Sequence, residues 1–187
     1  MKKFFISSIL ALCAFAASAQ TLVVYYSRSG QNYTSDGIVN LKKGNTQVFA
    51  EKIQSLTGAD IFRLETVREY AADYRKCTQE AKEELDAQAR PALKADIDIS
   101  KYDTIYLGWP CWWGTYPMCV ATFLEAHDWN GKTVIPFTTH EGSGWGRGLG
   151  DLKAALPKAT VGKGLAIQGS KVSTSMTQIE KFVAEGK

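Results

Sequence analysis

This sequence of 187 residues has no long apolar run after its N-terminal segment. A membrane-spanning helix needs about 20 apolar residues, and the apolar run from Phe4 to Ala17 is too short. That run follows Lys2 and Lys3 and ends in small residues before Gln20. We therefore interpret residues 1–19 as a secretory signal peptide. We expect residues 20–187 to form one exported domain without stable membrane insertion.

A strong charge and a metal-binding pattern are also missing. Without Lys2 and Lys3, the 22 basic residues become 20 against 19 acidic ones, a net charge of +1. Such a chain has no general attraction for nucleic acid or anionic membranes. The chain has two histidines, and its cysteine spacings match no zinc pattern, so we expect no metal site. An odd number of cysteines after position 19 implies an unpaired thiol or an intermolecular bond.

Apolar runs alternate with helical patterns through the rest of the chain. We expect strands at 21–26, 60–64, 104–107, 133–137 and 161–167. Helical patterns lie between them and after the last one, at about 49–56, 73–88, 118–126, 149–156 and 176–182. This alternation predicts an α/β fold, a doubly wound five-stranded parallel sheet of order 2-1-3-4-5 in three layers. Ligands of such sheets bind at the carboxyl ends of the strands, beside the point where the first and third strands lie next to each other.

The loop after the first expected strand runs from Ser27 to Asn32 and ends with Gly44, Asn45 and Thr46 at a helix start. Hydroxyl groups and amides at a helix N-terminus favour an anion. Serine and asparagine also cap helices and shape turns. By itself this loop leaves the two interpretations open.

The loops after the third and fourth strands are rich in tryptophan and glycine. The loop after the third strand contains Trp109, Trp112 and Trp113, an aromatic set that suits stacking on a planar ring. The alternative is that one tryptophan is in the core and another covers the sheet edge; we expect such a packing role for Trp109 but not for both Trp112 and Trp113. The loop after the fourth strand runs from Thr138 to Gly146, and its glycines permit close approach of the backbone to a ligand; a plain flexible loop is the alternative.

Two motifs, Pro-x-Trp-Trp-Gly at 110–114 and Thr-His-x-Gly-Ser-Gly at 139–144, make the chain from Thr21 to about Val183 resemble the flavodoxin family. The resemblance implies a flavodoxin-like fold and bound FMN. It implies that Ser27, Ser29, Gly30, Asn45 and Thr46 bind the phosphate. It also implies that the ring is flanked by Pro110, Cys111, Trp112, Trp113 and Gly114 on one side and by Thr139, His140, Glu141, Gly142, Ser143 and Gly144 on the other.

The chain departs from that family pattern in its first loop and in its charge. Gln31–Lys43 is inserted between the halves of the phosphate loop, and we expect the insert to loop outward while the two halves converge. Alternatively Asn32, Tyr33 and Thr34 replace part of the phosphate site. Flavodoxins that carry electrons are usually acidic, whereas this chain is near neutral.

The sequence therefore predicts an FMN-binding, flavodoxin-like redox protein, exported to the bacterial periplasm. Its partner is a redox protein or a small-molecule electron acceptor. An FMN-dependent NAD(P)H:quinone-type reductase and a non-redox binding module are the alternatives. We expect no catalytic side chain, and a hydrogen-bonded loop role for His140. Cys111 is either an inert packing residue, a redox-sensitive thiol or a partner of Cys119.

Overall fold

The computed structural model describes residues 20–186, so the predicted signal peptide lies outside the described residues. The central sheet contains β1 (Gln20–Tyr26), β4 (Asp60–Leu64), β5 (Tyr102–Pro110), β6 (Thr133–His140), β7 (Thr160–Val161) and β8 (Leu165–Gln168). Its order is β4-β1-β5-β6, and both β7 and β8 pair with β6. All of these pairings are parallel. The predicted order 2-1-3-4-5 is confirmed.

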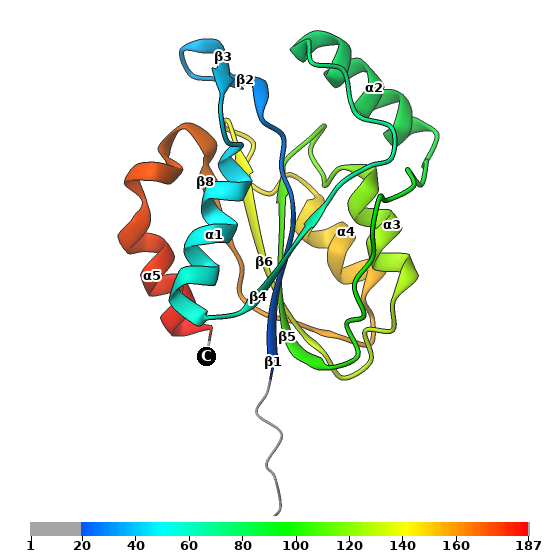
Figure 1. The fold of residues 1–187 in the computed structure, drawn as a ribbon, viewed down its shortest axis with the longest axis vertical. Helices are drawn as coiled ribbons and strands as arrows, with labels where there is room; N and C mark the ends of the chain where they lie inside the picture. Colours follow the sequence, from blue (N-terminus) through cyan, green and yellow to red (C-terminus); the bar gives the residue numbers. More distant parts are fainter. Residues whose placement is uncertain (1–19, 187) are drawn as a thin grey trace, which may run out of the picture.

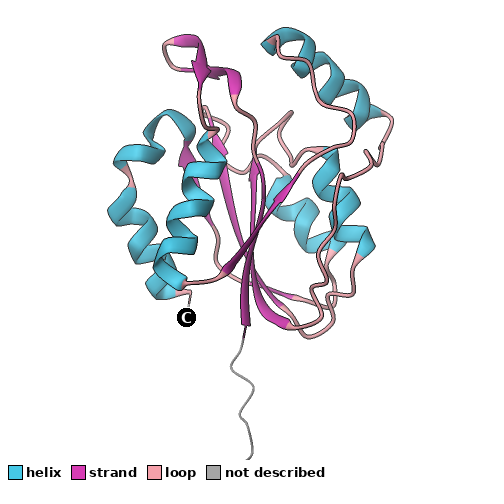
Figure 2. Ribbon diagram, viewed as in Figure 1, coloured by secondary structure: helices cyan, strands magenta, loops and turns pink. Residues whose placement is uncertain are grey.

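Helices cover both faces of this sheet (Figures 1 and 2). α1 (Asn45–Thr57) and α5 (Met176–Glu185) lie on one face, and α3 (Met118–Ala126) and α4 (Gly148–Ala155) lie on the other. Consecutive β1 residues point to opposite faces: Val23 belongs to one hydrophobic core, and Leu22 and Val24 belong to the other. A strand buried on both faces needs an uninterrupted apolar run, which explains this part of the sequence. No helix within residues 20–186 is long and apolar enough to cross a bilayer.

The fifth predicted strand, 161–167, is divided into β7 and β8. The β6 residues Ile135 and Pro136 face the three residues 162–164, so the pairing register slips. Pro136 has no N–H group to donate to a neighbouring strand. A Cβ atom on Gly164 would lie 2.7 Å from the Pro136 carbonyl oxygen, so the chain needs glycine there. β8 leads into the 3₁₀ helix Gly169–Thr174.

The insertion forms a separate antiparallel hairpin of β2 (Gly30–Thr34) and β3 (Gly37–Leu41). Ser35 and Asp36 connect the strands, and Gly37 has a φ of 100°. The Thr34 hydroxyl accepts from the Asp36 amide at 3.2 Å and donates to the Gly37 carbonyl at 3.1 Å. The hairpin stands beyond the carboxyl ends of the sheet strands, as the expected outward loop (Figure 1).

α2 (Tyr74–Asp86) begins at the Asp73 cap, whose carboxylate accepts from the Lys76 amide at 2.9 Å. The helix lies at the carboxyl end of the sheet, across from the hairpin, instead of along a sheet face (Figure 1). Cys77 and Ala81 are its buried residues, which agrees with the exposed helix predicted at 73–88. The hairpin and α2 therefore extend the structure at the edge of the sheet where ligands of doubly wound sheets bind.

Candidate functional site

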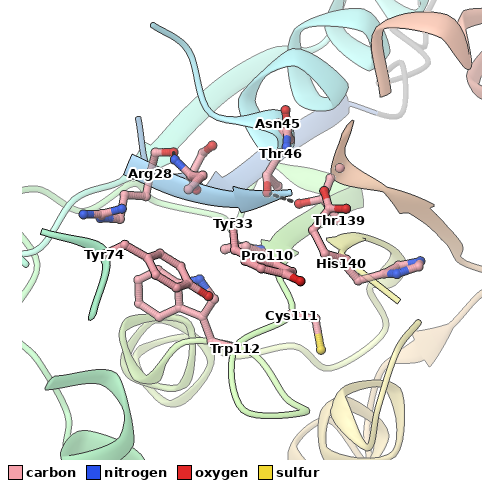
Figure 3. A pocket seen from close by; sticks show the side chains of 14 residues that line it. Arg28, Tyr33, Asn45, Thr46, Tyr74, Pro110, Cys111, Trp112, Thr139 and His140 are labelled. Carbon is pink, nitrogen blue, oxygen red and sulfur yellow. Dashed lines mark hydrogen bonds between the residues drawn. The ribbon is translucent and has the colours of Figure 1, made fainter. Parts of the chain in front are cut away.

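A pocket opens at the carboxyl ends of β1, β5 and β6, between the hairpin and α2 (Figure 3). Its lining comes from the first loop, the two loops after β5 and β6, α2 and the chain after β8. The lining residues are Ser27, Arg28, Asn32, Tyr33, Asn45, Thr46, Tyr74, Pro110, Cys111, Trp112, Thr139, His140, Glu141 and Gly169. The structure thus brings together residues from all three loops that the sequence singled out.

The α1 side of the pocket consists of buried polar groups. The Ser27 hydroxyl accepts from the Gln47 amide at 3.0 Å, so Ser27 caps α1 from the end of β1. A Cβ atom on Gly44 would lie 2.3 Å from Ser27 Oγ and 2.4 Å from the Arg28 carbonyl oxygen. Only glycine therefore permits this approach of the helix start to the strand end, and the predicted convergence of the two loop halves is confirmed.

The first turn of α1 offers free donors to the pocket. Among residues 20–186, the hydrogen bonds at the start of α1 use the Gln47 and Val48 amides, and none is donated by the Asn45 or Thr46 amide. The Thr46 hydroxyl is 2.7 Å from the Thr139 hydroxyl on β6, and both side chains are buried (Figure 3). Unpaired amides at a helix start and the helix dipole together favour an anion. Capping by Ser27 therefore leaves the neighbouring amides of Asn45 and Thr46 available for an anion.

Ser29 and Gly30 lie outside the pocket, although the resemblance placed them at the phosphate. They line a neighbouring cavity on the β4 side, together with Arg63 and Lys94. Gly30 has a φ of 80° and starts β2, so the chain turns away from α1 there. Asn32 does line the pocket, but its amide donates to the Arg28 and Gly30 carbonyls at 3.2 and 3.0 Å. Its side chain therefore shapes the hairpin entry.

The three tryptophans of the second loop have different environments. Trp109 is fully buried, as expected. Trp112 lines the pocket and packs edge-on against Tyr26 and Tyr70, with ring centroids 5.4 and 5.2 Å away. Trp113 lies outside the pocket and is 52% exposed, and its indole donates to the Thr78 carbonyl of α2 at 2.8 Å.

The backbone around these tryptophans explains their divergence. Trp113 has a φ of 49° and Gly114 one of 77°, which turns the chain sharply after Trp112. The Gly114 carbonyl accepts from the Arg147 amide at 2.7 Å, so Gly114 joins the second loop to the third instead of lining the pocket. Pro110 and Cys111 do line it, and the Cys111 amide donates to the Thr139 carbonyl at 2.7 Å.

The third loop contributes Thr139, His140 and Glu141 to the pocket, whereas Gly142, Ser143 and Gly144 continue beyond it. The Glu141 carboxylate accepts from the Ser170 amide at 2.7 Å and from Gln168 Nε2 at 3.1 Å. A Cβ atom on Gly169 would lie 2.5 Å from the Asn45 side chain, so this glycine permits close packing between the chain after β8 and α1.

His140 is held by its own loop. Its Nδ1 accepts from the Gly142 amide at 3.0 Å, so a proton of the neutral ring resides on Nε2. Burial lowers the pKa of His140 below its usual value, and the nearby Glu141 charge opposes this with a smaller effect. His140 is therefore neutral at pH 7, in the hydrogen-bonded loop role expected from the sequence.

Three lining residues, Arg28, Tyr74 and Gly169, were in no prediction of site residues, and Tyr33 was named only as part of the alternative phosphate site. Arg28 donates to the Ala71 and Ala72 carbonyls at 2.7 Å and also to the Gln31 carbonyl. Tyr33 of the hairpin stacks on Tyr74 of α2, with centroids 6.3 Å apart. The Asp36-Gly37 pair is a hairpin signal that would have placed Tyr33 on a strand, but no local pattern indicates contact with α2.

Cys77, Cys111 and Cys119 are all free thiols in the structure, so Cys111 and Cys119 form no disulfide there. Cys119 is buried in α3, and burial raises its pKa far above the usual range. Burial also raises the pKa of Cys77, to about 11.

Residues 20–186 contain no group of three or more side chains able to hold a metal ion.

Comparison with known proteins identifies the family. The sequence profile described as flavodoxin matches residues 20–184. The chain belongs to the flavodoxin family. No match was found among curated protein sequences.

Solved structures show the same fold for this flavodoxin-family chain. A putative flavoprotein from Bacteroides uniformis is 26% identical, with a TM-score of 0.70 over 89% of this chain and 98% of the other. One from Bacteroides eggerthii is 26% identical, with a TM-score of 0.67 over 87% and 98%. A flavoprotein from Lactobacillus acidophilus, solved in complex with FMN, is 22% identical, with a TM-score of 0.62 over 84% and 98%.

Proposed function

We propose that this protein binds FMN in the pocket of Figure 3 and transfers electrons through it. The observation that carries the proposal is the pairing of anion donors and an aromatic side chain within one pocket. The Asn45 and Thr46 amides lie at the α1 side, and Trp112 lies across from them. Family membership and the FMN-bound relative support a flavin cofactor.

The groups that line the pocket suit the two ends of the cofactor, and because the pocket itself measures only about 120 Å³, a bound FMN would extend out of it. A phosphate dianion suits the free amides and the positive end of the α1 dipole. A planar ring suits the indole of Trp112, whose position is determined by its packing on Tyr26 and Tyr70. The hydrogen bond from the Cys111 amide to the Thr139 carbonyl holds the loops after β5 and β6 together.

When bound, FMN supplies the redox chemistry, and the protein supplies binding, orientation and electrostatics. Asn45 and Thr46 would hold the phosphate end, while Trp112 and the backbone of residues 110–112 would border the ring. His140 is neutral and its Nδ1 is occupied, so it contributes no charge to the pocket. The electron partner is a redox protein or a small-molecule acceptor.

The central test is FMN binding by purified residues 20–187. Wild-type protein should quench FMN fluorescence on titration and become yellow. Trp112→Ala should weaken binding about fivefold, which corresponds to roughly 1 kcal/mol for one aromatic contact. Trp113→Ala is the matched control, because this neighbouring indole lies outside the pocket. Colourless protein that does not bind FMN would contradict the proposal.

A reductase that takes hydride from NAD(P)H and passes it to a quinone is the second candidate. The near-neutral net charge favours it, because steering toward a protein partner benefits from strong opposite charge. An anaerobic reductive titration followed in the visible spectrum distinguishes the two. Resolved one-electron steps favour the electron carrier, and direct oxidation of NAD(P)H with a quinone present favours the reductase.

We further propose that residues 1–19 direct export to the periplasm. The support is the basic start, the apolar run and the small residues before Gln20. Expression of the full chain in a bacterium, followed by cell fractionation and N-terminal sequencing, tests this. A mature protein beginning at Gln20 in the periplasmic fraction is expected; an uncleaved protein in the cytoplasm would contradict export.

A further inference from the structure

A second compartment of about 350 Å³ adjoins the proposed flavin pocket, on its α2 side. The two share Arg28, Asn32, Tyr74, Cys111 and Trp112. The rest of the second lining comes from Trp113 and one face of α2, with Cys77, Thr78 and Ala81. Its volume lies within the range of about 300–1,000 Å³ that is typical of small-molecule sites.

Three aromatic side chains, those of Tyr74, Trp112 and Trp113, line this second compartment. The hydrogen bond from the Trp113 indole to the Thr78 carbonyl holds this side chain on α2, and backbone hydrogen bonds between Trp112 and Thr115 close the turn in which it lies. Trp112 is held by Tyr26 and Tyr70, and Tyr74 by its stacking on Tyr33. The indoles of Trp112, which is partly buried, and Trp113, which is 52% exposed, are held by specific contacts and provide flat surfaces that suit a planar ring.

Arg28 gives this compartment a positive charge. It donates to the Gln31, Ala71 and Ala72 carbonyls, which hold the guanidinium in place without neutralising its charge. The guanidinium has more N–H donors than these bonds use. The positive charge of Arg28 acts to lower the pKa of the Cys77 thiol, against the larger effect of burial, so this charge affects the part of α2 that lines the compartment. A carboxylate suits this environment.

We propose that the second compartment binds a small planar aromatic anion alongside the flavin pocket, with its carboxylate at Arg28 and its ring between α2 and the Trp112–Trp113 loop. The inference rests on the proposed function, because it gives that redox site a small-molecule ligand class. The hairpin and α2 would then serve to build a ligand site that the sheet alone does not provide.

The test uses 2-naphthoate as the probe and equilibrium dialysis against FMN-loaded protein. We expect saturable binding, and at least fivefold weaker binding of the uncharged 2-naphthamide. Thr78 lines the second compartment but not the first. Thr78→Phe should therefore weaken 2-naphthoate binding at least tenfold while FMN affinity changes less than twofold. Thr78→Ser is the matched control and should bind like wild type.

Several results would overturn the inference: no binding of 2-naphthoate, equal affinity for the amide, or unchanged binding by Thr78→Phe. Release of FMN by the probe would also overturn it, because the two ligands would then share one site. The comparison of 2-naphthoate with 2-naphthamide needs only wild-type protein, so it still tests the inference if Thr78→Phe does not fold.

Failure of the proposed function has a different signature, which is that wild-type protein does not bind FMN. The same dialysis without FMN then tests the compartment alone. Binding of 2-naphthoate that Thr78→Phe abolishes would support the site, and binding that this substitution leaves unchanged would overturn it.

Discussion

On the α1 side of the pocket, Ser27, Thr46 and Thr139 are buried and joined by hydrogen bonds between neighbouring elements. On the α2 side, Tyr33 is 49% exposed, and Trp113, which lies just outside the pocket, is 52% exposed. The α1 side is formed by the ends of β1 and β6 and the start of α1, all of which pack in the core. The α2 side is formed by a hairpin and a helix that stand beyond the sheet (Figure 1).

This difference in burial indicates that the α1 side and the α2 side of the site have different roles. Groups anchored in the core have little freedom, which suits recognition of a constant group such as a phosphate. Elements with few buried contacts open at lower free energy and tolerate change. We therefore expect substitutions on the α1 side to affect folding and cofactor binding together, and substitutions on the α2 side to have local effects.

The largest effect is expected from Gly44→Ala. The added Cβ atom would meet Ser27 Oγ and the Arg28 carbonyl at well under contact distance, which forces the start of α1 away from β1. Overpacking of this kind costs about 2–3 kcal/mol. Urea denaturation should show that loss, and FMN titration should show binding weakened far more than by Trp112→Ala.

Gly150→Ala provides the control for this glycine substitution. Gly150 lies within α4, and no atom lies within 4 Å of the position of its added Cβ. Alanine there should stabilise the protein by about 0.5–1 kcal/mol. Equal stability of the two variants would show that the α1 side is not as tightly built as described.

Thr139→Val should have the next largest effect. It leaves the buried Thr46 hydroxyl without its partner at 2.7 Å, which costs about 1–3 kcal/mol. Removing both hydroxyls, with Thr46→Val added, should cost less than the sum of the two single changes. A double-mutant cycle by urea denaturation measures this coupling, and strictly additive costs would argue against a direct hydrogen bond.

Tyr33→Ala tests the α2 side and should have a smaller effect. It removes the stacking of Tyr33 on Tyr74, worth about 0.5–1 kcal/mol at a half-exposed position. Amide hydrogen exchange should accelerate in β2 and β3 while exchange in β1 and α1 stays unchanged. Tyr33→Phe keeps the ring and should resemble wild type. Faster exchange throughout the sheet would contradict the local character of this side.

The smallest effect concerns pH. Burial lowers the pKa of His140 in the folded protein, whereas the unfolded residue titrates near 6.5. The unfolded chain therefore binds the proton first, and folding stability falls as pH drops from about 6.5 toward the folded pKa. His140→Gln should remove this contribution. Thermal melts of both proteins from pH 7.5 to 5 should converge on the acid side; parallel curves would contradict the pKa shift.

The sheet order and most helices were predictable because they depend on patterns within short segments. β1 is an uninterrupted apolar run, and α1 ends at Gly58, which adopts a φ of 68°. The fifth strand was predicted as one piece, because its break depends on Pro136 of β6 beside it. A neighbour across the sheet does not appear in the local sequence.

For the pocket, the sequence identified the three loops but not the direction of each side chain within them. Trp112 and Trp113 are adjacent and chemically identical, yet one lines the pocket and the other bonds α2. Ser27 lines the pocket, whereas Ser29 lines only the neighbouring cavity on the β4 side, which Ser27 also borders. These outcomes follow from the backbone turns at Gly30 and Trp113 and from contacts with the hairpin and α2.

The sequence by itself determined the alternation of strands and helices and the positions of the loops that meet at one edge of the sheet. The periodicity of apolar residues records which segments are buried, and parallel connectivity then brings the strand ends together. Only the tertiary structure decided that the inserted hairpin and α2 extend that edge into a second compartment. The decisive contacts join residues about 40 positions apart, such as Arg28 with Ala71 and Gln31 with Tyr74, and no local pattern specifies contacts over such separations.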